Sequence, residues 1–173
     1  MLRKLAILVL LLALLIFAAA IFKTKYSGKS QKKIHYHAGF QVYKNNKLVD
    51  FSDLKYMDDK PCMVNGKTID SGNDQLEKAH LHDLVGDVVH IHRNSVYWRD
   101  VFINLKYSLN GEKVEGYIAG KKVDNILNYP IKTYDILILF VDSHKDISSY
   151  LPKAVTKQHI LEVEQRSETC GNN

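Results

Sequence analysis

The sequence lacks most of the short motifs that identify a known type of enzyme or binding site. Its 173 residues contain two cysteines, Cys62 and Cys170, which are too few for a disulfide framework and do not form a C-x-x-C pair. The glycine-rich phosphate-binding patterns, the G-x-S-x-G nucleophile pattern and the H-E-x-x-H zinc pattern are all missing. A Ser–His–Asp site stays open, because its members need not be close in sequence. Whether Cys62 and Cys170 pair also stays open.

Negative charge is missing from the first part of the chain. Seven of the 24 Lys and Arg residues precede Ile34, and no Asp or Glu does. From Ile34 onward 17 basic residues meet 19 acidic ones, a net charge of −2. The overall charge of +5 therefore comes from the N-terminal segment. We expect no nucleic-acid partner, because the rest of the chain has no net basic field; the sequence does not identify a protein partner.

Long hydrophobic runs are also scarce, and the longest lies at the N-terminus. Leu5 to Phe22 contains 18 apolar residues without a charge, about 27 Å as a helix, which is close to the thickness of a hydrocarbon core. The alternative is a signal peptide cleaved near Ala18-Ala19-Ala20. Because the apolar run continues past that site, we predict an uncleaved transmembrane anchor in residues 1–22 and a basic linker in residues 23–33.

Two signals for membrane orientation disagree. Five lysines follow the hydrophobic run, whereas only Arg3 and Lys4 precede it, so the positive-inside rule favours a cytoplasmic C-terminal domain. A basic start followed by an apolar run is typical of an export signal and favours the opposite. We predict a single-pass protein of the cell membrane whose soluble domain is extracytoplasmic.

Histidine is what the sequence does have, and it comes in pairs. Six of the eight histidines form three H-x-H pairs, whereas random placement predicts roughly 0.4 pairs. Residues i and i+2 of a β-strand point to the same face, so each pair on a strand places two imidazoles side by side. The alternative is a half-exposed sheet face without a specific function. The pairs are His35/His37, His80/His82 and His90/His92.

Neutral imidazole is a ligand for zinc, copper, iron and nickel. Three histidines and a water would make a catalytic type of zinc site, and four would make a closed one. We therefore predict binding of zinc or copper by His35, His37, His80, His82, His90 and His92. Because six histidines exceed one tetrahedral shell, either two sites exist or some of the pairs are structural. Asp83 and Asp87 are candidates to orient imidazole N–H groups, although both also fit an ordinary turn. Cys62 is a further candidate ligand, or a simple thiol.

Hydrophobic alternation predicts strands over residues 34–43, 79–82 and 88–92, each with its histidines opposite the clearer apolar set. Asn45-Asn46 predicts a hairpin that returns over residues 48–51. Residues 134–141 are almost continuously apolar, which predicts a central strand buried on both faces. Residues 52–73 are expected to form a long loop.

The remaining elements are predicted from capping and turn residues. Ser95 is expected to cap a helix over residues 96–105, in which Trp98, Val101, Phe102 and Leu105 form one buried stripe. Asn110-Gly111 predicts a hairpin between residues 105–109 and 113–118. A further helix is expected between residues 152 and 166.

Three strings together resemble a known family: H-x-H-A-G-F-x-V-Y, then A-H-L-H-D-x-V-G-D-V-V-H-I-H-R, then W-R-D. They are similar to small membrane-anchored proteins of bacteria with reduced genomes, over about residues 34–141. Some members of that family are labelled protein-disulfide isomerase, which would imply thiol–disulfide exchange with Cys62 as the catalytic residue. That chemistry needs an attacking thiolate and normally a resolving partner, and only Cys62 lies in the predicted domain.

The sequence thus predicts an α+β protein: a small β-rich domain with one or two short helices, preceded by a single transmembrane helix. The domain is expected over residues 34–151 and a C-terminal tail over residues 152–173. The leading functional hypothesis is transition-metal binding by the histidine pairs. Thiol–disulfide exchange at Cys62 is one alternative, and a non-catalytic contact surface whose histidines respond to pH is another.

Overall fold

The computed structural model describes residues 34–58, 63–64, 67–68 and 73–167. The chain divides into a unit of residues 1–33 and a unit of residues 34–173. The second unit has hydrophobic clusters built from its own side chains, as expected of a domain that folds alone. Among the described residues no helix is long and apolar enough to cross a membrane. The predicted anchor and linker, Cys62 and Cys170 lie outside the described residues.

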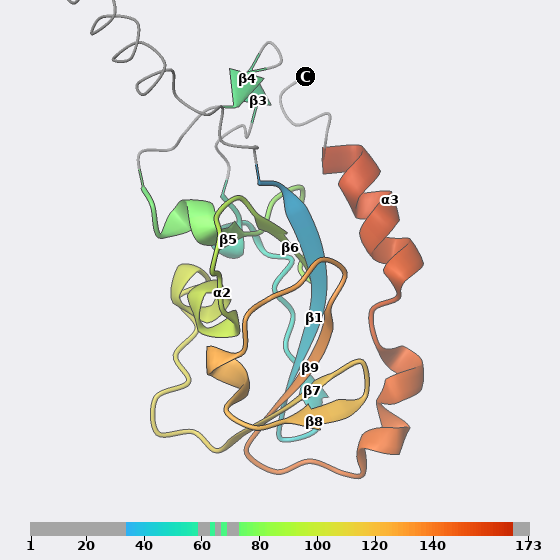
Figure 1. Ribbon diagram of the computed structural model, residues 1–173. Helices are drawn as coiled ribbons and strands as arrows, with labels where there is room; N and C mark the ends of the chain where they lie inside the picture. The colour runs from blue at the N-terminus through green and yellow to red at the C-terminus, as the bar shows by residue number, and fades with distance from the viewer. Residues whose placement is uncertain (1–33, 59–62, 65–66, 69–72, 168–173) are drawn as a thin grey trace, which may run out of the picture. The chain divides into compact units, whose positions relative to one another are not determined.

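A mixed sheet forms the middle of this domain (Figure 1), which agrees with the predicted β-rich α+β class. Its strand order is β5-β6-β1-β9-β7-β8, and the short β2 pairs with β1. The β1–β9 pair is parallel, whereas the other pairs of this sheet are antiparallel. Its strands are β1 (Tyr36–Lys44), β2 (Lys47–Leu48), β5 (Ala79–His80), β6 (Val88–Ile91), β7 (Val114–Ile118), β8 (Lys121–Val123) and β9 (Ile136–Val141). A separate hairpin contains β3 (Met63–Val64) and β4 (Lys67–Thr68).

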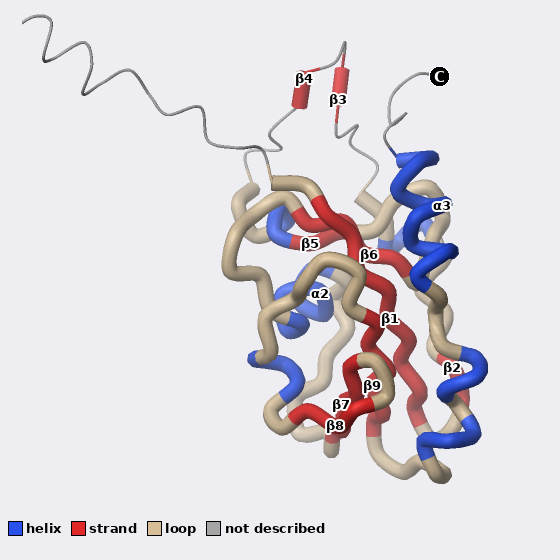
Figure 2. Tube along the Cα trace, turned by 45° about the vertical axis from the view of Figure 1, so that its right-hand side comes forward, coloured by secondary structure: helices blue, strands red, loops and turns tan. Residues whose placement is uncertain are grey.

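Helices cover both faces of the sheet at β1. Helix α2 (Trp98–Asn104) packs on one face, where the Phe40 ring lies 6.4 Å from the Trp98 ring. Helix α3 (Lys157–Ser167) runs along the opposite face (Figure 2). Five 3-10 helices complete the described chain: η1 (Leu54–Tyr56), η2 (Leu76–Lys78), η3 (Ile126–Asn128), η4 (Ile147–Ser149) and η5 (Leu151–Lys153).

The close approach of α3 depends on Gly39. A Cβ atom at this position would lie 2.6 Å from Val155 Cγ1 and 3.1 Å from Ile160 Cδ1, so no larger residue fits without movement. Gly39 is two residues from His37 on the same strand and shares its face. The face that carries the histidines is therefore covered by the C-terminal helix, and it is not the half-exposed surface that the alternative interpretation requires.

The C-terminal helix belongs to the packed unit. Val155, Ile160 and Val163 are buried together with Val88. The segment after residue 151, which we expected to be a tail, thus contributes to the core through the predicted helix.

Several predicted elements are confirmed. Asn45 and Asn46 have φ values of 49° and 67° and connect β1 to β2, as expected of a two-residue hairpin turn. Strand β9 lies between β1 and β7 with both faces packed, so the apolar run does form a central strand.

Two predictions about the middle of the chain are wrong. Tyr97, not Ser95, caps α2, and the Asp100 side chain accepts the Tyr97 backbone N–H at 2.9 Å. Ser95 itself has a φ of 57°. Residues 105–109 form no strand, because Lys106 has a φ of 53° and turns the chain out of the helix. Strand β7 pairs instead with β8 and β9.

Candidate metal centre

The strand register brings one histidine from each pair into a single row. His90 of β6 is the register partner of both His80 on β5 and His37 on β1. His35 and His92 continue the same face one step further along β1 and β6, and His82 follows β5. The structure therefore gathers all six predicted histidines at one end of the sheet.

Five of these histidines are buried. Their exposed fractions run from 0% for His37 to 9% for His92, and only His35 is exposed. Buried polar groups are normally paired with hydrogen-bond donors, acceptors or ions. A cluster of imidazoles buried mainly against one another is therefore unusual, and its contacts indicate what it can bind.

Imidazole nitrogens converge on His90. His37 Nε2 lies 2.7 Å from His90 Nδ1, and His82 Nε2 lies 3.0 Å from the same atom. His35, His37 and His90 each offer one nitrogen, and these three atoms lie within 4.8 Å of one another. Two nitrogens bound to one tetrahedral zinc ion are separated by about 3.3 Å, given zinc–nitrogen bonds of about 2.0–2.1 Å. The spacings within the cluster therefore lie on both sides of this value, from 2.7 Å up to at most 4.8 Å.

The outward nitrogens of two histidines face oxygen atoms. His82 Nδ1 lies 2.5 Å from Asp83 Oδ2, and His80 Nδ1 lies 3.2 Å from the Leu76 carbonyl oxygen. A carboxylate or a carbonyl oxygen can only accept, so Nδ1 carries the hydrogen and Nε2 keeps its lone pair. Metal-binding histidines have this arrangement, in which an outer oxygen fixes the tautomer.

Glu164 of α3 lies near His37 without a hydrogen bond to its ring. Its Oε1 lies 3.8 Å from His37 Nδ1, beyond hydrogen-bond length, and its Oε2 accepts the Tyr134 hydroxyl at 2.9 Å. Sequence reasoning missed Glu164, because it lies 127 residues after His37 in a segment expected to be a tail. Only the packing of α3 on β1 brings the two together.

The rings of three histidines in the cluster, His35, His80 and His92, are stacked. The His92 ring lies 4.7 Å from the His35 ring and 5.1 Å from the His80 ring, with interplanar angles of 12° and 6°. His90 Nε2 and His92 Nε2 are buried and have no hydrogen-bond partner among the described residues. Unsatisfied buried nitrogens are costly, and a bound ion would satisfy them.

Burial keeps four of the six histidines neutral. Burial and, after it, repulsion by the neighbouring imidazoles together lower the pKa of His37 and of His92 to about 3. Burial also lowers the pKa of His80, and it brings the pKa of His90 well below its ordinary value. Neutral imidazole is the form that binds a metal ion, so the cluster does not have to lose protons at neutral pH.

The other predicted site residues have different outcomes. Asp83 contacts His82, as expected of an orienting carboxylate. Asp87 instead lies 3.0 Å from Nε2 of His159, which is outside the six. Cys62 lies outside the described residues, so its predicted roles as ligand or catalytic thiol stay predictions.

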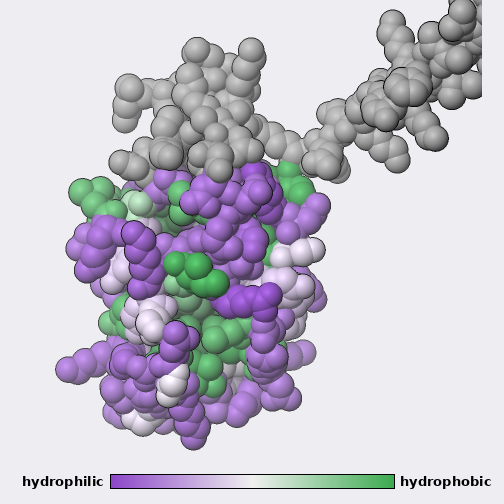
Figure 3. Space-filling model, turned by 90° about the vertical axis from the view of Figure 1, so that its left-hand side faces the viewer, coloured by the Kyte–Doolittle hydropathy of each residue, from purple (hydrophilic) through white to green (hydrophobic). Residues whose placement is uncertain are grey.

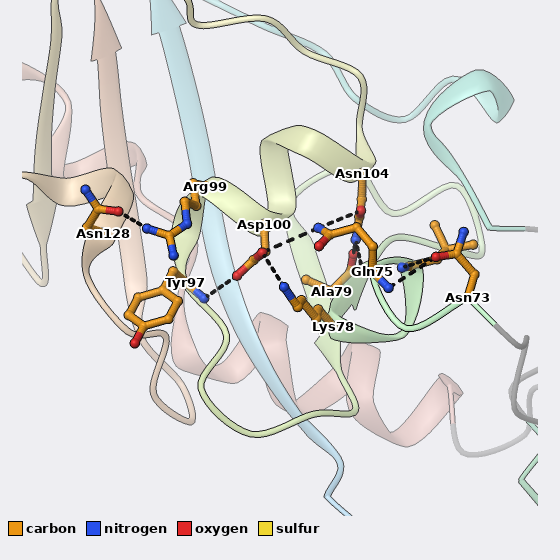
Figure 4. Close-up of polar contacts among 10 residues, drawn as sticks. Asn73, Gln75, Lys78, Ala79, Tyr97, Arg99, Asp100, Asn104 and Asn128 are labelled. Carbon is orange, nitrogen blue, oxygen red and sulfur yellow. Dashed lines mark hydrogen bonds and ion pairs between the residues drawn. The ribbon is translucent and has the colours of Figure 1, made fainter.

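Helix α2 holds the strand that carries His80 (Figure 4). Asp100 accepts from Lys78 Nζ at 3.0 Å, and Asn104 Nδ2 donates to the Ala79 carbonyl oxygen at 2.6 Å. Lys78 and Ala79 immediately precede His80 in the chain. The W-R-D string therefore has a structural role here, since its buried Asp100 both caps α2 and ties it to the segment before His80.

No family model, no curated protein and no solved structure is similar to this chain at a significant level. We therefore infer the function from the geometry of the site itself, and the family resemblance based on the histidine strings stays a proposal.

Proposed function

We propose that this domain binds a transition-metal ion, zinc or copper, through its histidine cluster. The observation that carries the proposal is the convergence of imidazole nitrogens on His90, together with oxygen atoms placed behind His80 and His82. His35, His37 and His90 lie close enough to hold an ion between them. All of these donors are nitrogens, which suits zinc and copper(II) better than hard ions such as calcium.

Without an ion, the cluster has a hydrogen-bond mismatch. His90 Nδ1 has room for one hydrogen or one lone pair, yet two Nε2 atoms approach it within 3.0 Å. The Nε2 of His82 carries a lone pair, because Asp83 takes its Nδ1 hydrogen. The nitrogens that lie close enough together to share one ion come from His35, His37 and His90, and such an ion would accept a lone pair from each of them. The arrangement is thus better explained by a cation than by a core histidine network.

The number of ligands decides the chemistry. His37 and His90 are buried, and His35 and His82 are the nearest candidates to complete the shell. A three-histidine shell leaves a position for water, whose pKa zinc lowers to about 7, whereas four histidines close the site. We favour a metal-binding or metal-handling role. The exposed His35 would be the ligand that meets solvent.

The cellular setting is part of the proposal. We infer that residues 1–22 anchor the chain in the cell membrane and that the domain is extracytoplasmic, as the hydrophobic run and the resemblance to membrane-anchored proteins suggest. Burial of five histidines argues against the alternative of a pH-responsive contact surface, because a partner protein would contact little of these buried side chains.

The test is a metal titration of an untagged fragment, residues 34–173, after its own metal has been removed. We expect one tightly bound equivalent of zinc or copper by calorimetry, confirmed by elemental analysis after gel filtration. His144→Ala serves as the matched control because His144 is outside the cluster and pairs with Glu115 at 3.1 Å. A fragment that is folded, as judged by circular dichroism, and takes up neither metal near neutral pH would overturn the proposal.

A further inference from the structure

A cavity lies on the other side of the sheet, away from the histidines. It is beside α2 and has a volume of about 410 Å³, which falls within the usual range for small-molecule sites. Figure 3 looks at the molecule from the α2 side and shows apolar surface in the middle of that face, surrounded by hydrophilic side chains. The apolar residues that line the cavity are Phe102, Ile103, Tyr107, Leu109 and Leu127.

The exposure of Ile103 indicates that this cavity is not only a space left between packed side chains. It belongs to the amphipathic α2, whose Trp98 and Val101 are buried, yet 56% of Ile103 is exposed. A large apolar side chain at the edge of an apolar hollow costs free energy unless something covers it. Lone exposed apolar residues are common, but this one adjoins a cavity with a buried aromatic wall, Phe102.

The charge of the cavity rim indicates what covers it. Arg99 lies one helical turn before Ile103, and Lys106 follows the end of the helix. None of the residues lining the cavity is acidic. Arg99 donates to the Asn128 side chain and lies over the Tyr97 ring, and neither Arg99 nor Lys106 has an ion pair within the described part of the chain. Two cations beside an apolar hollow complement a ligand with one acidic group.

We propose that this cavity binds a small amphipathic anion, with an apolar body against Ile103 and Leu127 and an acidic group between Arg99 and Lys106. The site is independent of the metal proposal, because no histidine of the cluster lines it. Apolar contacts would supply most of the affinity, and the rim charges would select the acidic group and speed its association. The ligand class is therefore that of medium-chain carboxylates and aromatic sulfonates.

Two fluorescent probes separate the apolar and ionic parts of the proposal. 1-Anilinonaphthalene-8-sulfonate carries a sulfonate, and N-phenyl-1-naphthylamine has the same ring system without it. We expect the folded fragment of residues 34–173 to bind one sulfonate probe saturably. Replacement Ile103→Glu should weaken binding of both probes at least tenfold. Arg99→Gln with Lys106→Gln should weaken only the sulfonate probe, by roughly threefold to tenfold, as expected for partly exposed charges.

Matched controls make the experiment decisive. Leu54 is 73% exposed and does not line the cavity, so Leu54→Glu adds the same charge and should change nothing. Ile103→Ser removes the apolar side chain without adding charge, and should also weaken both probes. Decanoate should displace the sulfonate probe more effectively than decyltrimethylammonium. Equal weakening by Leu54→Glu, unchanged binding in Ile103→Glu, or equal displacement by the two competitors would overturn the proposal.

Discussion

The two groups of histidines in this domain, the buried cluster and the outlying pair, differ in what their ring nitrogens contact. His144 and His159 are partly exposed, and each faces a carboxylate, Glu115 at 3.1 Å and Asp87 at 3.0 Å. In the cluster His90 instead meets the imidazoles of His37 and His82, and the carboxylates of Asp83 and Glu164 lie behind the rings.

The difference lies in what the ring nitrogens contact. Each outlying histidine has a carboxylate oxygen beside a ring nitrogen. In the cluster, burial and the other imidazoles lower the pKa of His37 and of His92, so these rings stay neutral and keep a lone pair for the proposed metal ion. The cluster therefore has the electrostatics of a ligand set for a metal ion, whereas the outlying histidines have those of surface hydrogen bonds.

Lowering the pH should reveal the difference between the two groups of histidines most strongly, through its effect on the stability of the domain. Burial and neighbouring imidazoles hold the pKa of His37 and of His92 at about 3 in the folded state, below the ordinary value of 6.5. Between pH 6.5 and pH 3 the unfolded chain therefore binds protons that the folded chain does not, and stability falls as the pH is lowered. Each such histidine costs about 1.4 kcal/mol per pH unit, so these two cost about 3 kcal/mol per unit.

Urea denaturation of the metal-free fragment at several pH values measures this effect. The free energy of unfolding should be level above pH 7 and fall steeply below pH 6. His159→Ala should leave the slope unchanged, since His159 is outside the cluster. A stability that stays level down to pH 4 would contradict the account of the buried cluster.

Loss of a ligand should have the next largest effect. His35→Ala removes an exposed member of the group that can hold an ion, so the fold should tolerate it. We expect the zinc dissociation constant to rise by more than the roughly 10- to 100-fold that loss of an outer-shell partner costs. The matched variant His144→Ala should bind zinc as the wild type does. Equal affinities for the two variants would remove His35 from the site.

The two carboxylates predicted from the sequence now give a sharper comparison. Asp83→Asn should weaken zinc binding by roughly 10- to 100-fold, because an amide holds the Nδ1 hydrogen of His82 less strongly than a carboxylate does. Asp87→Asn should leave the affinity unchanged, since Asp87 contacts His159. Competition with a zinc-binding dye measures both constants, and similar losses in the two variants would show that neither carboxylate acts on a particular ligand.

The smallest effect should come from the outlying histidines themselves. His159→Ala removes a partly exposed hydrogen bond to Asp87, which typically contributes below about 1 kcal/mol. Thermal unfolding should therefore shift by only a few degrees, with the metal affinity unchanged. A changed zinc affinity in this variant would mean that the two groups of histidines are coupled through α3.

The sequence predicted the orientation of the six histidines better than their surroundings. Period-2 alternation placed all six histidines on the right faces, because strand periodicity is local. It did not predict that α3 covers them, since the contact of Glu164 with His37 and the fit of Val155 over Gly39 join residues far apart in the chain. It also misplaced the cap of α2, because Tyr97 and Asp100 replace the usual Ser pattern.

X-ray absorption spectroscopy of the zinc-loaded fragment of residues 34–173 tests the central claim most directly, because it reports the ligand atoms themselves. The account predicts a shell of nitrogen scatterers at about 2.0–2.1 Å, with the outer-shell pattern of three or four imidazoles and no sulfur. A sulfur scatterer at about 2.3 Å would assign the ion to a cysteine. A shell without the imidazole pattern would show that the histidine cluster does not hold the metal.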